Sequence, residues 1–207
     1  MRTSASGKKF PQPAVYALDG LIPVIDPSSF VHPSAVLIGD VIIGPDCYIG
    51  PGACLRGDFG RLSIGKGSNI QDNCVIHTDP GWDTLIEENG HIGHSAVLHC
   101  CFVRRNALVG IGAVVMDRAE VGEAAIVGAK SFVKADFKVP PRSLVMGSPA
   151  RVVRELSDAD IQRKTQGTLE YQHLTLRCHA SMEAVEALKA LEADRPRLPP
   201  FQHIGKD

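Results

Sequence analysis

The chain has 207 residues, with 22 lysines and arginines against 23 aspartates and glutamates, and a formal net charge of −1 at pH 7. Because the charges nearly balance, the chain has no excess of positive charge with which to bind nucleic acid or an anionic membrane surface. No apolar run approaches the roughly 18 residues of a membrane span, and the first residues carry no apolar secretory core. We therefore expect a cytoplasmic protein with no nucleic-acid or membrane partner.

Residues 1–15 show no periodic apolar pattern and are expected to form a flexible leader. From Val31 to about Ala150 an aliphatic residue recurs every six positions, often followed by glycine and with a small residue in fifth place, as in IGPDCY, IGHSAV and VGIGAV. Such short apolar segments, punctuated by glycine and proline, do not fit the 3.6-residue period of a helix. Because one repeat is stable only when stacked on its neighbours, residues 16–150 are predicted to form a mainly β domain, a parallel β-helix of hexapeptide repeats.

Three hexads, about eighteen residues, make one coil of such a helix, which gives three walls. Wall A starts at Ile49, Ile70 and Ile92, wall B at Leu55, Ile76 and Leu98, and wall C at Ile64, Ile86 and Val103. The spacing departs from six between walls B and C on all three coils. We interpret these departures as inserted loops or short deletions that leave the register of the walls unchanged.

The six cysteines form no CxxC pair and no regular framework, which is more typical of reduced thiols than of disulfides. Cys47 and Cys74 occupy the small fifth place of their hexads, so they are expected in the core.

Residues 151–207 have a different composition and are predicted to form a C-terminal helical extension. Ser157, with Asp160 three residues later, provides an N-cap for a first helix. A second helix is expected over Ser181–Ala193, ending before the prolines at 196–200. We expect these C-terminal α-helices to pack along the β-helix and to shield one face.

Histidines in the second place of wall B carry the predicted chemistry. His77 and His99 follow Arg56 on consecutive coils, and coils stack at about 4.8 Å, so both imidazoles can reach one metal ion at about 2.0–2.1 Å. A lone histidine on a strand is usually structural, which is the interpretation we give to the remaining ones: His32, His91, His173, His179 and His203. Cys100 and Cys101 are expected to pack rather than to bind metal.

On wall A, Gln71 and Asp72 occupy the second and third places, and His94 lies one coil above Asp72. Because His94 is on a different wall from His77 and His99, it would most easily complete the site from a neighbouring chain. A threefold axis closes that arrangement. Three neutral histidines with an open position for water are the pattern of catalytic zinc, so we predict a homotrimer with metal sites between subunits.

The segments LRGDFGRLSIG, NIQDNCVIH and GHIGHSAVLHCC resemble the γ-class carbonic anhydrase-like family of hexapeptide-repeat proteins. The likeness runs from about Tyr16 to Leu198 and is greatest to members associated with phenylacetate degradation and with the carnitine operon. It implies that the β-helix is left-handed and the protein homotrimeric, with Zn2+ at His77, His94 and His99. Fe2+ or Co2+ are alternatives to zinc.

The resemblance also implies roles for neighbouring residues. Gln71 would orient the water, Arg56 paired with Asp58 or Asp72 would fix the interface and polarise a carbonyl, and Tyr171 would complete the pocket. The alternative for Arg56, Asp58 and Asp72 is an intersubunit salt-bridge network, and the two roles can coexist.

The sequence is compatible with four functions. The first is hydrolysis of small acyl-CoA thioesters, with Arg104, Arg105, Lys130 and Lys134 available to CoA phosphates. The second is reversible hydration of CO2 to bicarbonate, although Asp58 is followed by Phe59 and Gly60 where the archetypal anhydrase has an acidic loop, so that Asp79 and Asp83 are the remaining proton shuttles. The third is a hexapeptide acyltransferase without zinc, and the fourth is a trimeric scaffold without catalysis.

Overall fold

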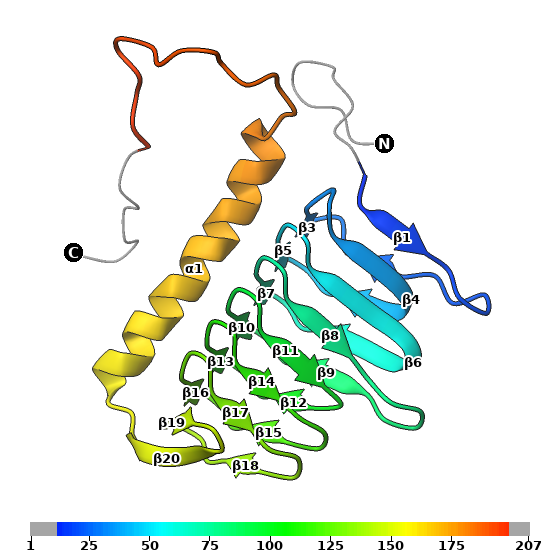
Figure 1. Ribbon diagram of the computed structural model, residues 1–207, viewed down its shortest axis with the longest axis vertical. Coiled ribbons are helices and arrows are strands. Elements are labelled where there is room, and N and C mark those ends of the chain that lie inside the picture. The colour runs from blue at the N-terminus through cyan, green and yellow to red at the C-terminus, as the bar shows by residue number, and fades with distance from the viewer. Residues whose placement is uncertain (1–11, 199–207) are drawn as a thin grey trace.

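Short parallel strands wind into a β-helix, and one long α-helix lies along its side (Figure 1). The computed structural model describes residues 12–198, so residues 1–11 of the expected leader lie outside the described part. The prediction of a mainly β, parallel β-helix of hexapeptide repeats is confirmed. Its handedness and the trimer stay predictions.

Wall A is a single sheet that runs the length of the solenoid. Its strands, in sequence order, are β3 (Phe30–Val31), β5 (Tyr48–Ile49), β7 (Asn69–Ile70), β10 (His91–Ile92), β13 (Leu108–Val109), β16 (Ile126–Val127), β19 (Ser143–Gly147) and β20 (Ala150–Glu155). The last of these, β20, runs antiparallel to β19. The hairpin therefore ends the wall at the C-terminal side.

Walls B and C form one twelve-stranded sheet, because the long strands β4 (Val36–Ile43) and β6 (Cys54–Ile64) continue from one wall into the other. Wall B continues with β8 (Val75–His77), β11 (Val97–His99), β14 (Val114–Val115) and β17 (Phe132–Val133). Wall C continues with β9 (Thr84–Ile86), β12 (Phe102–Val103), β15 (Glu120–Val121) and β18 (Lys138–Val139). At the N-terminal side, β1 (Ala14–Tyr16) and β2 (Val24–Ile25) pair with β4.

The predicted register of all three walls is confirmed. The paired residues are Ile49, Ile70 and Ile92 on wall A, Leu55, Ile76 and Leu98 on wall B, and Ile64, Ile86 and Val103 on wall C. The irregular spacings change only the connection between walls B and C. Extra residues therefore gather at the corner where these two walls meet.

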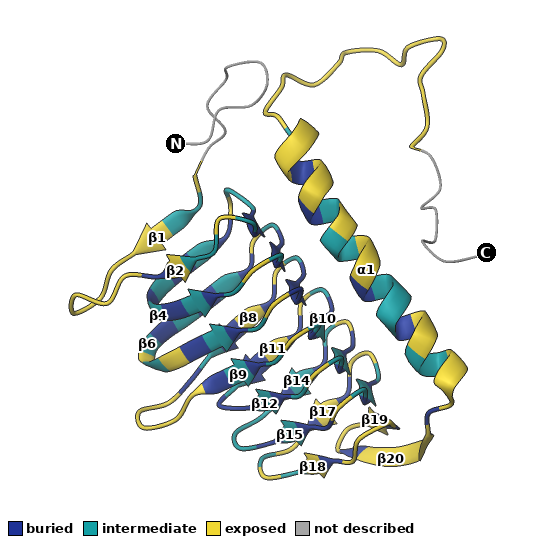
Figure 2. Ribbon diagram, turned by 180° about the vertical axis from the view of Figure 1, so that it is seen from behind, coloured by how far each residue is buried: buried dark blue, intermediate teal, exposed yellow. Residues whose placement is uncertain are grey.

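The interior of the β-helix is filled by the aliphatic first-place residues and the small fifth-place residues. Figure 2 shows buried positions on strands throughout the solenoid. Cys47 and Cys74 are fully buried, as predicted, and all six cysteines are free thiols. Burial raises the pKa of both thiols to about 11. These two cysteines are packing residues and not nucleophiles.

Helix α1 (Asp158–Ser181) begins at the predicted N-cap. Ser157 accepts from the backbone N–H of Asp160, and the Asp160 carboxylate accepts from the backbone N–H of Ser157, which completes a capping box. Gln172 donates to the carbonyl of Gly67, and the Tyr171 ring lies 5.3 Å from that of Tyr48, so α1 packs against the turns and strands of wall A. Among the described residues, no helix combines the length and the apolarity needed to cross a membrane.

The second predicted helix, over Ser181–Ala193, is wrong: apart from Ser181, the last residue of α1, this stretch contains no helical residue. Its apolar side chains Val185, Leu188 and Leu191 are 72%, 63% and 82% exposed. An isolated segment of this length is a marginal helix unless it buries an apolar side. Here the chain leads away from the β-helix after α1, so no surface is available to that side (Figure 1).

Lys164 of α1 is buried, at 6% exposure, and donates to the carbonyl of Asn89 and to Oδ1 of Asn106 at 2.9 and 2.6 Å. Burial lowers the pKa of its ammonium from 10.5 to about 7. Between these values the folded chain binds fewer protons at Lys164 than the unfolded chain, so the free energy of unfolding rises with pH across that window.

We expect the free energy of unfolding of the Lys164→Met variant to lack the rise with pH that Lys164 causes between about pH 7 and 10.5. The measurement is the denaturant midpoint at about pH 7.5 and 9.5 in both chains, with the exposed Lys189→Met as a control. Because the two chains differ only at residue 164, the difference in pH dependence isolates Lys164. An identical pH dependence in the native chain and in Lys164→Met would contradict the assignment.

Candidate metal centre

His77 and His99 face each other on neighbouring coils of wall B. Their backbones pair in register, their ring centroids are 5.2 Å apart, and Nδ1 of His77 lies 3.2 Å from Nε2 of His99. Two nitrogens bound to one tetrahedral zinc at about 2.0–2.1 Å stand about 3.3 Å apart. The structure thus brings two of the three predicted ligands to the separation that a shared ion requires.

A carboxylate holds the other nitrogen of each of these rings. Nε2 of His77 is 2.8 Å from Oδ1 of Asp58, and Nδ1 of His99 is 2.5 Å from Oδ1 of Asp117. When a neutral imidazole donates its N–H to a carboxylate, its second nitrogen presents a lone pair. Two facing lone pairs at 3.2 Å need a cation between them, which is either a shared proton or a metal ion.

His94 carries the same arrangement on wall A. Its Nδ1 is 2.8 Å from Oδ2 of Asp72, and its Nε2 lies 3.5 Å from the Tyr171 hydroxyl. In the described part of the chain, no hydrogen bond or ion pair joins His94 to His77 or His99. One chain therefore brings together two of the predicted ligands and presents the third on another wall, with 40% of its side chain exposed.

Gln71 supports His94 instead of standing at the facing pair. It is 3% exposed, its Oε1 accepts from the backbone N–H of His94 at 3.2 Å, and its Nε2 donates to Nε2 of His91 at 2.8 Å. Burial lowers the pKa of His91 to about 3, so this ring stays neutral and can accept. Gln71 is thus placed to position His94. Its predicted role, to orient a water, would be exercised on the His94 side of the centre.

Arg56, which the stacking of wall B placed below His77, lies against that ring, and so does Asp58, whose role came from the resemblance. Nη2 of Arg56 is 3.0 Å from Nε2 of His77, and Nε of Arg56 is 3.2 Å from Oδ2 of Asp58. The latter is an ion pair by distance only, because this buried Nε has no partner in hydrogen-bond geometry. Nε2 of His77 has one proton to give, and the carboxylate is the acceptor that needs it. Arg56 therefore has donors left for another group.

Tyr171 reaches the site from α1, but on the wall A side. Its ring packs against His91 and Tyr48, and burial raises the pKa of its hydroxyl to about 12. The hydroxyl is therefore a neutral hydrogen-bond donor near His94. If Tyr171 completes the pocket as predicted, it does so next to His94 and not next to His77 and His99.

Arg104 and Arg105 do not join the histidines. Arg104 forms ion pairs of 2.8 Å with Glu87 and 2.6 Å with Glu120, and its guanidinium lies 5.5 Å from the Phe102 ring centroid on wall C. Arg105 has a longer contact, 3.5 Å, with Glu123. Since both charges are already paired within the chain, a role toward CoA phosphates would require them to exchange partners.

Sequence reasoning missed Asp117 and gave Cys100 no part in the site. Oδ1 of Asp79 lies 3.7 Å from Nε2 of His99, and Sγ of Cys100 accepts from the backbone N–H of Asp79. The ligand-capable atoms of Asp79, His99, Cys100 and Asp117 lie within 4.8 Å of one another. Leu98 pairs with Val115, so one more coil of the wall B register places Met116 opposite His99, and the contact of Asp117 from the next position does not follow from the spacing.

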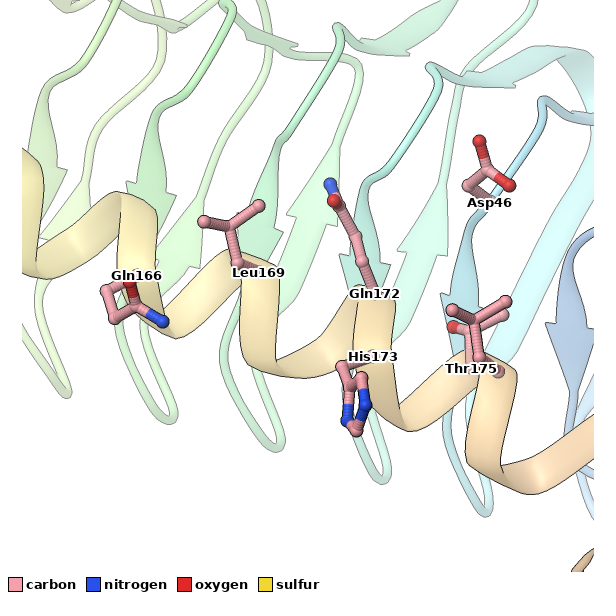
Figure 3. A pocket seen from close by; sticks show the side chains of 7 residues that line it. Asp46, Gln166, Leu169, Gln172, His173 and Thr175 are labelled. Atoms are coloured by element: carbon pink, nitrogen blue, oxygen red, sulfur yellow. The ribbon is translucent and has the colours of Figure 1, made fainter. Parts of the chain in front are cut away.

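Two hollows of the described part of the chain lie away from the facing histidines. A groove of about 370 Å3 runs beside α1 and is lined by Asp46, Gln166, Leu169, Gln172, His173, Thr175 and Leu176 (Figure 3). A second, of about 430 Å3, lies on wall C and includes Glu87 and Arg105. Neither contains a predicted metal ligand. The side chains of the facing histidines keep 16% (His77) and 25% (His99) of their surface exposed.

The fold and the site together define a hexapeptide-repeat protein with a histidine–carboxylate centre on one wall. The bacterial transferase hexapeptide family (six repeats) matches residues 23–57. The chain is 54% identical over 185 residues to the carnitine operon protein CaiE of Proteus sp. (strain LE138), a match that covers 89% of this chain and 94% of that protein. For CaiE of Escherichia coli K12 the identity is 55% over 183 residues, covering 88% and 93%. The chain belongs to the CaiE family of hexapeptide-repeat proteins.

Two solved structures share the architecture. A candidate acetyltransferase of Bacillus cereus matches with a TM-score of 0.80 and 32% identity over 81% of this chain and 98% of that one. A hexapeptide transferase family protein of Anaplasma phagocytophilum matches with a TM-score of 0.76 and 36% identity over 79% and 97%. These relatives carry the names of the carnitine operon and of transferases, and the expected likeness to phenylacetate-degradation members stays a prediction.

We predict that Asp117→Asn weakens metal binding by about 10- to 100-fold, because the amide no longer holds the His99 ring as the carboxylate does. The measurement is metal retention against a competing chelator. Asp136→Asn is the matched control, since Asp136 is an exposed aspartate paired with Arg118. Equal metal retention by the two variants would exclude a supporting role for Asp117.

Proposed function

We propose that this chain is a zinc-dependent hydrolase of small acyl-CoA thioesters that acts as a homotrimer, with one metal site at each subunit interface. The observation that supports it most directly is the pair of facing imidazole nitrogens of His77 and His99, each ring backed by a carboxylate. His94, backed by Asp72, would complete the ligand set from the partner subunit. These donors fit zinc, with Fe2+ or Co2+ as alternatives, because neutral imidazoles backed by carboxylates are typical of catalytic zinc sites.

The surface of wall B supports the assembly. Val75 and Val97 pair in register beside the histidines, and with Phe132 two coils further they leave apolar side chains 38%, 36% and 36% exposed. Ile111, in the coil above His94, is 54% exposed on the wall A side. An apolar column next to the proposed metal ligands suits contact with a second copy, and a cyclic trimer would give all three chains the same contact.

Zinc held at this interface would lower the pKa of a bound water towards 7 and so supply a nucleophile at neutral pH. The chain's residues provide the rest. Asp58, Asp117 and Asp72 hold the three rings, and Arg56, with 42% of its side chain exposed, has N–H donors available to a carbonyl oxygen. In the overall reaction the acyl carbon gains a bond to the water oxygen, the C–S bond breaks, and the departing sulfur takes up a proton.

The substrate class comes from the resemblance to the phenylacetate-degradation protein PaaY. Thioesters suit a single activated water, because a thiolate leaves more readily than an alkoxide or an amine. Arg104 is held in two ion pairs, which do not favour its predicted role in binding CoA phosphates. Arg105, with one longer ion pair, is more available to a phosphate than Arg104.

Hydration of CO2 to bicarbonate at the same centre is a second candidate, favoured by Asp79. Its carboxylate is 52% exposed and lies 3.7 Å from Nε2 of His99, between the site and solvent. A group so placed can carry a proton away, which an anhydrase needs at every turnover. The γ-class carbonic anhydrase activity would therefore depend on Asp79.

Acyl transfer is a third candidate, favoured by the hexapeptide transferase family match and by the two solved relatives. It needs an acceptor amine or hydroxyl and no metal. The facing histidines of wall B would then share a proton. Metal content separates this function from the other two.

The test combines elemental analysis, native mass and thiol release from a series of acyl-CoA esters. We expect a trimer with one zinc per chain, ester-dependent thiol release, and loss of metal and activity in His99→Ala but not in the helix variant His173→Ala. Stopped-flow hydration of CO2, compared with Asp79→Asn, measures the second activity. A metal-free protein that transfers acyl groups to an acceptor, or a metal-loaded trimer without turnover, would overturn the proposal.

A further inference from the structure

Two exposed aromatic residues stand at the rim of the candidate metal centre. Phe59 is 55% exposed and Trp82 is 44% exposed. We propose that Phe59 and Trp82 form a subsite for the acyl group of the substrate, which selects flat or branched apolar acyl groups over acetyl. This rests on the proposed function, because it assumes that a carbonyl compound reacts beside His77 and His99.

The chain places both residues at one corner. Phe59 lies in β6 between the part that pairs with β8 on wall B and the part that pairs with β9 on wall C. Trp82 lies one coil higher, in the connection from β8 to β9. The two longest departures from the six-residue spacing thus add residues to the same corner on consecutive coils. The two insertions build a raised edge next to the histidine column.

Contacts within the chain join this edge to the site. The Phe59 ring centroid is 5.5 Å from that of His77. The next residue, Gly60, lies directly against the backbone of Trp82: a Cβ at Gly60 would be 2.1 Å from the Trp82 carbonyl oxygen. The backbones that carry the two aromatic residues are therefore in contact; the Phe59 ring borders the proposed metal ligand His77, and the Trp82 ring borders Arg118.

The connection that carries Trp82 is held by hydrogen bonds from several sides. The Thr78 hydroxyl donates to the Trp82 carbonyl at 2.6 Å, the Trp82 N–H donates to the Asp79 carbonyl at 3.1 Å, and the Arg61 N–H donates to Asp83 at 3.0 Å. The guanidinium of Arg118 lies 5.5 Å from the Trp82 ring centroid. A side chain on such a fixed loop can offer a defined apolar surface at little entropic cost to a ligand.

The chemistry of the surface points to an apolar acyl group. Phe and Trp rings bind flat or branched apolar groups by stacking and burial, and they offer an acetyl group little contact area. The thiol and nucleotide parts of CoA are common to all esters. The subsite should therefore change the order of preference among acyl groups without changing how CoA itself is recognised.

Trp82 is the only tryptophan of the chain, so its fluorescence reports on this corner alone. We would mix the full-length, metal-loaded protein rapidly with phenylacetyl-CoA, isovaleryl-CoA, acetyl-CoA and free CoA, which share the same absorbing nucleotide, and read the emission before turnover. We expect a saturable change in emission with the first two, at concentrations about ten-fold lower than for acetyl-CoA. We expect Phe59→Leu to weaken that binding by roughly five-fold, and Phe102→Leu, on wall C, to leave it unchanged.

Steady-state hydrolysis gives the second readout. Phe59→Leu and Trp82→Leu should raise KM for phenylacetyl-CoA several-fold, with little change in KM for acetyl-CoA. Equal titration curves for all esters, or equal effects of Phe59→Leu and Phe102→Leu, would overturn the subsite. A change in native mass in Phe59→Leu and Trp82→Leu would assign the aromatic pair to subunit contact and would also overturn it. If no ester is hydrolysed but the fluorescence preference persists, the proposed function fails while the acyl subsite stands.

Discussion

The centre of this molecule depends on two imidazole nitrogens that face each other across one coil spacing. The register of wall B stacks His77 on His99, and the carboxylates of Asp58 and Asp117 take the outer N–H groups. The inner nitrogens, 3.2 Å apart, are then left to a cation. The β-helix scaffold makes this pairing rigid, because neither residue can shift along its strand without moving the aliphatic residues that fill the interior.

The same scaffold tolerates additions at its corners, and this is where function can be added to it. Between walls B and C the chain adds residues on the coils of Phe59 and Trp82, while Ile64 and Ile86 remain paired with their neighbours. A β-helix can thus carry loops beside a site without a change in the site itself. The His–carboxylate pairs and the aromatic rim are separable features, so related chains can keep one while altering the other.

Much of the architecture could be predicted from the sequence, because a six-residue period leaves few alternatives. The wall assignment of Ile70, Ile76 and Ile86 needed only counting, and it placed His77 next to His99 correctly. The second helix over Ser181–Ala193 could not be judged in this way, because its helical pattern depends on a surface to pack against, and spacing says nothing about that surface. Counting places Met116, not Asp117, opposite His99. The contact of Asp117 with His99, like the pairing of Gln71 with His91 and His94, depends on side-chain directions that a period does not contain.

If two subunits share one metal site, chains that each lack a different ligand should complement each other when they are mixed. Chains carrying His94→Ala and chains carrying His99→Ala each lack one ligand, and each should bind no stoichiometric zinc as a homotrimer. After unfolding and refolding together in equal amounts, about a quarter of the interfaces would combine intact His77 and His99 of one chain with intact His94 of the next. The account predicts that zinc binding and thiol release return to about a quarter of the native level. No recovery in a mixture that forms trimers, or full zinc binding by either variant alone, would contradict it.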